Sequence, residues 1–179
     1  GDGYMEMKSC WMTKYPITIF QYLEFVQDGG YHKEEFWSKE HWDWIQHEHL
    51  ECPSDWIKES EQWLIRLPLR IVPIEQVYNH TVSVCLAEAK AFAGWYRDKH
   101  RIKDSVTIPT EYQWLQAIGM DSPQAPPIYQ RLYSCSCHGI LNKMEPESIV
   151  NNMDLENKYG VSHLVGNAWE WTSSPFAPF

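Results

Sequence analysis

Large aromatic side chains place the strongest constraint on how this chain folds. Its 179 residues include 10 Trp and 10 Tyr, alongside 11 Pro and 9 Gly. Proline and glycine interrupt helices and strands, whereas each buried aromatic ring removes a large apolar surface from water. The combination predicts an irregular fold in which planar side chains pin loops in place. At this length we expect one domain, residues 1–179, burying roughly 70% of its unfolded surface.

Charge and hydropathy exclude several classes of protein. Lys and Arg number 15 against 24 Asp and Glu, so the formal net charge of −9 would repel a nucleic-acid backbone. Hydrophobic residues make up 44% and charged residues 22%, close to the globular average. No apolar run approaches the roughly 20 residues that span a bilayer. We therefore expect no nucleic-acid partner, no membrane insertion and no extensive disorder.

The cysteines favour a reducing compartment. They are too few and too scattered for a disulfide scaffold, and their odd number leaves one unpaired: Cys10, Cys52, Cys85, Cys135 and Cys137. The amino terminus shows no basic region followed by an apolar one, so no secretory signal is visible. We expect a cytoplasmic protein, in which the sequon at Asn79 would have no role.

Capping patterns and apolar spacing predict four helices. Thr18 with Gln21 forms a capping box ahead of a helix that Gly29-Gly30 ends. A second helix is expected from Ser38 through Ile45, with Trp37, His41 and Trp44 sharing one face.

The third helix, Leu86 to Arg97, has an apolar stripe of Ala89, Phe92, Ala93 and Tyr96. Thr110 with Gln113 caps a fourth, Glu111 to Ile118, whose inward residues are Trp114, Ala117 and Ile118. Residues 4–15 alternate loosely enough to predict a strand. The proline-containing stretch 51–78 is expected to be loop with short extended pieces.

Four collinear segments resemble the formylglycine-generating-enzyme family, also called the sulfatase-modifying-factor family. They are Tyr15-Pro16-Ile17-Thr18 with the helix that follows, Val84 through Trp95, Ile108-Pro109-Thr110-Glu111-Tyr112-Gln113-Trp114, and Gly166-Asn167-Ala168-Trp169-Glu170-Trp171-Thr172. The last matches the family's Gly-Asn-x-Trp-Glu-Trp signature. The resemblance implies an α+β fold, a variant of the C-type lectin fold, with few helices and short antiparallel strands. It also leads us to expect that Trp169 and Trp171 close the signature turn against the helices of Phe92 and Trp114.

Within that family, the chain looks most like the C-terminal domain of non-haem iron sulfoxide synthases. The residues concerned are Glu24 through Tyr31, Phe36-Trp37-Ser38, Trp42-Asp43-Trp44 and Trp169 through Phe176. These enzymes make ergothioneine and ovothiol precursors by joining a thiol to a histidine derivative with dioxygen. The resemblance implies a scaffold and substrate-binding domain, with an N-terminal iron-binding domain as its partner in the full-length protein.

The iron-ligand motif of those enzymes, His-x-x-x-His-x-Glu, is absent from this chain. The nearest cluster is His41, His47, His49 and Glu51. On a helix, positions 47 and 49 point about 200° apart, so both could face one metal only if the helix had already ended. A solvated polar edge is the simpler interpretation. The Arg-rich segment that follows in the family is also missing, so we expect Fe²⁺ in the full-length enzyme only and no activity of the isolated chain.

Two alternative functions stay open. Cys135-Ser136-Cys137-His138 could serve a formylglycine-generating oxidase acting on a sulfatase cysteine, although the family's copper-binding thiols follow the signature and these precede it. A non-catalytic lectin-like binding module is the other. That alternative follows from the tolerance of the lectin-like scaffold for loop variation. Separately, five tryptophans could line a pocket for a cation such as a trimethylated amine, although core packing is the expected use of most of them: Trp37, Trp42, Trp44, Trp56 and Trp63.

The signature turn also implies a structural Ca²⁺ site. In the family, backbone carbonyls and a Glu carboxylate of this turn bind calcium, a hard cation that takes six to eight oxygens. Residue by residue, that assigns Gly166, Ala168 and Glu170 as ligands. His163 stands where an Asn or Asp oxygen is expected, which would weaken the site. Alternatively, Glu170 merely bonds backbone amides in a turn pinned by Trp169 and Trp171.

Overall fold

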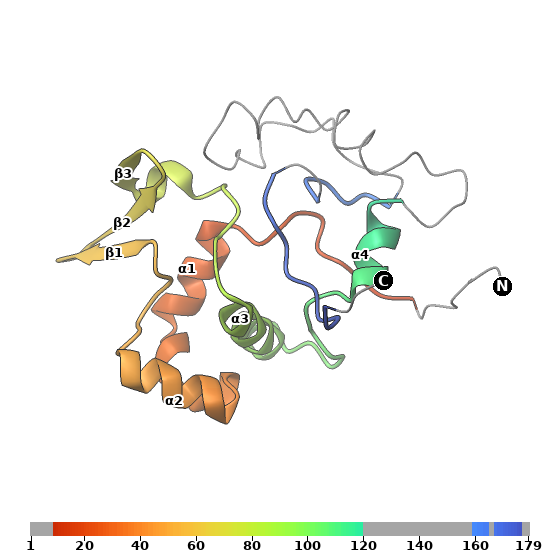
Figure 1. Cartoon of the computed structure of the whole chain (residues 1–179), viewed down its shortest axis with the longest axis horizontal. Coiled ribbons are helices and arrows are strands. Elements are labelled where there is room, and N and C mark those ends of the chain that lie inside the picture. The colour runs from red at the N-terminus through yellow and green to blue at the C-terminus, as the bar shows by residue number, and fades with distance from the viewer. Residues whose placement is uncertain (1–8, 120–158, 165–166, 177–179) are drawn as a thin grey trace.

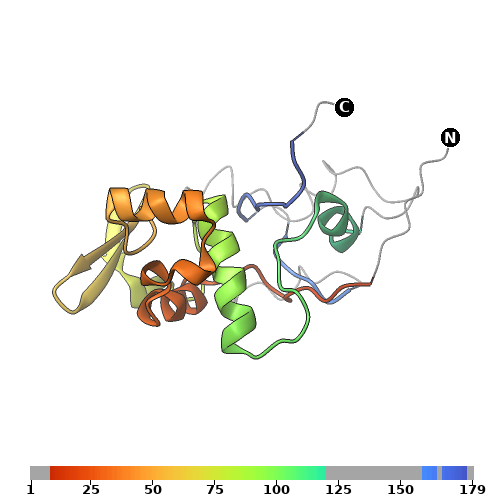
Figure 2. The ribbon, with the colours of Figure 1, turned by 90° about the horizontal axis from the view of Figure 1, so that it is seen from below.

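The computed structural model describes residues 9–119, 159–164 and 167–176. Within them lie four α-helices, three short 3-10 helices and a three-stranded sheet, which confirms the α+β class. Figure 1 shows α1, α2, α3 and the sheet on one side of the molecule. Helix α4 lies on the other side, beside the carboxyl-terminal segment, and Figure 2 shows the same division from a second direction.

Helix α1, Ile19–Gln27, begins and ends where its capping residues predict. The Thr18 amide donates to Gln21 Oε1 at 3.0 Å, and the Gln21 amide donates to Thr18 Oγ1 at 3.2 Å. These two bonds satisfy amides that have no partner inside the helix. After the last turn, Gly29 takes the left-handed conformation with φ of 77°, which a residue with a side chain adopts only with strain.

Helix α2, Lys39–Glu48, extends past its predicted end at Ile45. Ser38 caps it, and Trp37 is buried just before it. Ile45 faces the core, whereas Trp44 is 39% exposed. Trp37 and Trp44, which were expected to share one face, therefore differ: Trp37 lies in the core and Trp44 at the surface.

Helix α3, Leu86–Lys99, packs against α1 through a face centred on Ala91 and Phe92. Ala87 and Trp95 are also buried, while Ala89, Ala93 and Tyr96 are only half-buried. The buried face of α3 is thus rotated by part of a turn from the predicted apolar stripe. The reason is that Trp95, the largest residue of the helix, lies on the buried side against Phe25.

In residues 51–78 the predicted short extended pieces are three strands, and they pair into a sheet that the sequence pattern did not predict. Strands β1 (Trp56–Glu59), β2 (Gln62–Leu67) and β3 (Arg70–Pro73) pair antiparallel in the order β1-β2-β3. A 3-10 helix, Ile74–Val77, follows. Each proline of this stretch avoids the interior of a strand: Pro53 precedes β1, Pro68 follows β2, and Pro73 ends β3. Proline at such positions removes no internal ladder hydrogen bond, so it is compatible with the sheet.

The other two predictions about elements had opposite outcomes. Helix α4, Glu111–Ala117, is confirmed with its Thr110–Gln113 capping box and with Ala117 and Ile118 buried. The predicted strand over residues 4–15 is not seen in its described part, residues 9–15. There, the Lys14 carbonyl accepts a hydrogen bond from the Ser162 amide at 2.8 Å. None of the described helices is long and apolar enough to cross a membrane.

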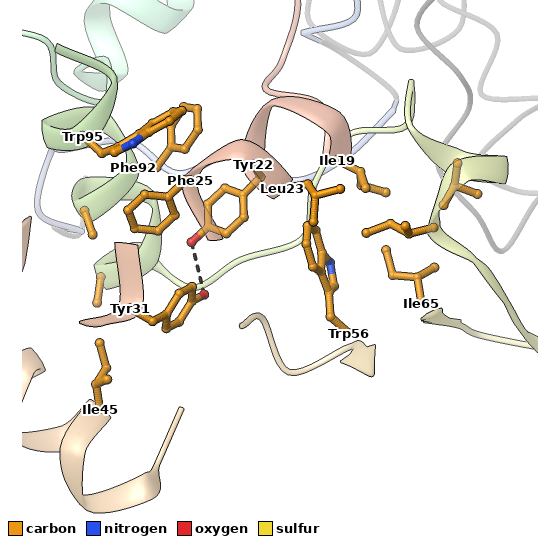
Figure 3. Packing of buried hydrophobic residues seen from close by; sticks show 14 of the residues in the cluster. Ile19, Tyr22, Leu23, Phe25, Tyr31, Ile45, Trp56, Ile65, Phe92 and Trp95 are labelled. Carbon is orange, nitrogen blue, oxygen red and sulfur yellow. Dashed lines mark hydrogen bonds between the residues drawn. The ribbon is translucent and has the colours of Figure 1, made fainter. Parts of the chain in front are cut away.

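The core is built around aromatic rings, as the composition predicts (Figure 3). Phe25 is fully buried, with rings of Tyr22, Phe92 and Trp95 around it at centroid distances of 5.3, 6.0 and 5.7 Å. Of the five tryptophans considered for a cation pocket, Trp37 and Trp56 are buried, and Trp42 and Trp63 pack against the core. These four tryptophans are therefore used in core packing, whereas the fifth, Trp44, is exposed.

Candidate functional site at the carboxyl-terminal turn

A short extended segment, residues 81–84, anchors the signature turn. On one side it pairs with the chain ahead of α1: Thr18 and Thr81 form an antiparallel bridge, and the Val82 amide donates to the Ile17 carbonyl at 3.0 Å. On the other side it meets the turn, where Asn167 Nδ2 donates to Thr81 Oγ1 at 3.1 Å. The segment thus joins the beginning of the fold to its end.

The turn is also fastened to the first turn of α4. Glu170 Oε2 accepts a hydrogen bond from Trp114 Nε1 at 2.8 Å. The Ser173 amide donates to the Pro109 carbonyl at 2.8 Å, and Ser174 Oγ accepts from the Glu111 amide at 3.0 Å. The last contact satisfies one of the helix amides that have no internal partner.

The signature tryptophans do not pin this turn through burial. Trp169 is fully exposed, and Trp171 is 49% exposed, although its Nε1 donates to the Val84 carbonyl at 2.9 Å. The expectation that both rings close the turn against the helices of Phe92 and Trp114 is therefore wrong. The alternative prediction, that Glu170 bonds backbone amides, is not seen among the described residues either, since Glu170 Oε2 accepts from the Trp114 indole. In the described structure, polar contacts fasten the turn.

Glu170 is the residue with the most unusual environment in the turn. Its Oε1 is buried and finds no hydrogen-bond donor among the described residues. Burial raises the pKa of this carboxyl to about 7, against the smaller, opposite influence of the Trp114 hydrogen bond. A cation bound to this oxygen would stabilise the ionised carboxylate, which burial alone disfavours.

The turn's other predicted ligands are only partly visible. Ala168 is half-buried beside Glu170, whereas Gly166 lies outside the described residues. His163, at the position where the resemblance expects an oxygen ligand, is buried at 3% exposure and has a φ of 63°. Its ring lies 6.1 Å from that of Tyr15.

Comparison with known proteins identifies the family of this chain. The family model described as "Sulfatase-modifying factor enzyme 1-like domain" matches residues 3–179. The chain belongs to this family. Its signature turn and the capped helix α4 are both inside the matched range.

Three curated relatives are similar to this chain over most of its length. All carry the name hercynine oxygenase. The protein of Mycolicibacterium smegmatis is 24% identical over 98% of this chain and 39% of its own length. That of Mycobacterium tuberculosis is 24% identical over 92% of this chain and 37% of its own, and that of Mycolicibacterium thermoresistibile 25% over 92% and 35%. The chain thus spans under two fifths of each relative.

The histidine cluster near α2 does not form a metal site in the described structure. His41 bonds Ser38 Oγ through Nδ1 at 2.7 Å, and His47 Nδ1 lies 2.9 Å from Glu48 Oε1. His49 and Glu51 are exposed. No three His, Cys, Asp or Glu side chains of the described ranges gather where they could hold a metal ion. In the described structure His47, His49 and Glu51 form an exposed polar edge.

The thiols divide between described and undescribed regions. Cys135, Cys137 and His138 lie outside the described residues. Of the others, Cys10, Cys52 and Cys85 are free thiols. Burial raises the pKa of Cys52 to about 11 and also raises that of Cys85, so neither is activated as a nucleophile at neutral pH.

The sequence reasoning missed one buried polar network. Tyr22 and Tyr31 hydroxyls lie 3.2 Å apart, and the Tyr31 hydroxyl donates to Glu88 Oε1 at 2.5 Å. Glu88 Oε2 in turn accepts from the Cys85 amide at 2.7 Å. Glu88 stands three residues after Cys85, the spacing of a capping box. Cysteine is not among the usual capping residues, so the pattern did not stand out.

Proposed function

We propose that this chain is the scaffold and substrate-binding domain of an iron-dependent sulfoxide synthase of the ergothioneine type. Such an enzyme joins the sulfur of a thiol to a histidine derivative with dioxygen. The observation that supports this most is the name hercynine oxygenase on all three relatives, which align over 92% or more of the chain. The formylglycine-generating oxidase is supported by the family description alone, because its candidate thiols, Cys135 and Cys137, lie outside the described residues.

We further propose that the iron is supplied by an N-terminal domain of the full-length protein. The chain contains no His-x-x-x-His-x-Glu motif, and its described residues do not assemble three ligands. When bound there, iron would supply the dioxygen chemistry. The role left to this chain is to bind the thiol or the histidine derivative and to orient it. A cytoplasmic location accords with the free thiols of the described residues.

Calcium is the second proposed component, with a structural role in the signature turn. Glu170 Oε1 and the Ala168 carbonyl are the described candidates, and Gly166 is the third by the family resemblance. The fit rests on the buried Oε1, which has no donor among the described residues. Calcium there would neutralise the carboxylate that Trp114 positions, and would tighten the turn against α4.

The isolated chain provides the decisive experiment. We expect no sulfoxide above the no-protein control when it is mixed with Fe(II), hercynine, cysteine and oxygen, because the iron ligands lie elsewhere. Turnover would contradict the proposed division of labour. Calorimetry with hercynine or cysteine alone tests the binding role, and a heat of binding for neither would remove it. If the chain binds hercynine in calorimetry and this binding does not depend on metal, the result would instead support the binding-module alternative.

A further inference from the structure

Four oxidisable side chains form a continuous line through the core. Trp63 is half-buried on β2, and its ring lies 5.9 Å from that of Trp56 on β1. Trp56 lies 6.0 Å from Tyr22 on α1, whose hydroxyl is 3.2 Å from that of Tyr31. Indole and phenol rings are the protein side chains that lose an electron most readily, apart from thiols. In Figure 3 the two hydroxyls point at one another.

The inner end of this line differs from an ordinary aromatic core. Tyr31 is 1% exposed, and its hydroxyl donates to Glu88 Oε1 at 2.5 Å. Glu88 is itself 6% exposed, and its other oxygen is held by the Cys85 amide. Glu88 Oε1 is therefore already placed as the acceptor of the Tyr31 hydroxyl hydrogen bond.

We propose that Tyr31 and Glu88 form a one-electron redox site at the end of the Trp63–Trp56–Tyr22 line. An external one-electron oxidant removes an electron, which leaves through these rings. The Tyr31 O–H bond breaks, and its proton forms a new O–H bond on Glu88 Oε1. The products are a neutral phenoxyl radical, a neutral carboxylic acid and the reduced oxidant. A soluble one-electron reductant such as ascorbate returns the electron, and the proton goes back to Tyr31.

Two features favour this role over hydrogen bonding alone. The proton acceptor lies already in contact with the phenol, so oxidation needs no water in the core. Charge also stays balanced, since the step converts a neutral phenol and a carboxylate into a neutral radical and a neutral acid, and the electron leaves the core. The use of such a site, to hold oxidising equivalents away from bound substrate, rests on the proposed oxygen-consuming function. The site itself does not.

Photo-oxidation of the purified chain tests the proposal. A ruthenium(II) tris-bipyridine complex with persulfate generates a one-electron oxidant under a light flash, and electron paramagnetic resonance detects the radical in samples frozen afterwards. We expect a long-lived tyrosyl signal that is lost in Tyr31→Phe. The matched control is Tyr96→Phe. The Tyr96 ring also packs against the aromatic core, 5.8 Å from Phe92, but it is not part of the line, so the signal should stay unchanged.

Further variants separate the redox role from a structural one. Glu88→Gln retains an oxygen for the Cys85 amide but is a poor base, so the radical should decay faster. Trp56→Phe keeps the core filled and should lower the yield of the tyrosyl radical. If circular dichroism shows that Tyr31→Phe is unfolded, Trp56→Phe serves as the test variant in its place. An unchanged signal in Tyr31→Phe, an unchanged lifetime in Glu88→Gln, or an unchanged yield in Trp56→Phe overturns the proposal. None of these results depends on sulfoxide formation or hercynine binding.

Discussion

Asp55 shows how one carboxyl can make stability depend on pH. It precedes β1, and its Oδ1 is buried without a donor among the described residues. Burial first, and then the charge of Glu88, raise its pKa from 3.8 to about 6. The folded state therefore binds a proton that the unfolded state has released between these values. Stability from this group is present below about pH 4 and is lost as the pH rises through about 6.

We expect Asp55→Asn to flatten this dependence. Because the amide carries no charge to bury, the variant should be more stable than the parent at pH 7.5 by about 1–2 kcal/mol, allowing for solvent screening. At pH 4 the difference should shrink. Urea unfolding at both pH values gives the two free energies, and parallel profiles would show that Asp55 is not the group responsible.

Gly30 is required for a different reason, a lack of space. A Cβ at this position would lie 2.0 Å from Phe25 Cε2, and Phe25 is fully buried. Since the ring cannot move outward, Gly30→Ala should cost about 1–3 kcal/mol in denaturant unfolding. Gly94→Ala is the matched control, because its Cβ would meet Phe36 at an ordinary 3.7 Å. An equal cost for both would mean that the core yields more easily than its packing indicates.

At the scale of elements, one surface carboxylate connects α1 to α3. Asp28 Oδ2 accepts from Trp95 Nε1 at 3.1 Å and from Lys99 Nζ at 2.6 Å. The Lys99 contact is exposed, and exposed ion pairs contribute little. We expect Asp28→Ala to cost roughly 1 kcal/mol, mainly through the Trp95 bond, and Lys99→Ala to cost clearly less than Asp28→Ala. Chemical denaturation checks the order; a larger cost for Lys99→Ala would reverse the assignment.

The elements that could be predicted are those with local signals. Thr18 and Thr110 stand three residues before Gln21 and Gln113, and the hydrogen bonds that start α1 and α4 are made within that interval. The face of α3 and the sheet depend on distant contacts instead. Trp95 is buried because Phe25 packs on it, and no spacing within α3 reveals that. The same applies to Glu88, whose partner Tyr31 is 57 residues away.

For the whole molecule, the signature turn shows a similar division. Its location was evident from the motif, but its manner of attachment was not, because Trp169 is exposed where burial was expected. The assignment of Gly166, Ala168 and Glu170 to calcium stays a prediction. It has a direct test in the stability of the entire fold.

We expect added Ca²⁺ to raise the melting temperature of the chain relative to a chelator, since a ligand bound only to the folded state stabilises it. Glu170→Gln should remove most of that increase. The exposed acid Glu111, at the start of α4, offers the control Glu111→Gln, which should keep it. Differential scanning calorimetry gives the temperatures. An increase of the same size in Glu170→Gln would exclude this carboxylate as a ligand.

The four residues from Thr81 to Val84 have neighbours on both flanks, with Ile17 and Thr18 to one side and Asn167 and Trp171 to the other. A displacement of this segment would break the hydrogen bonds on both sides at once. Loosening at either terminus should therefore be felt at the opposite one, and amide protons on the two flanks should exchange with solvent at linked rates.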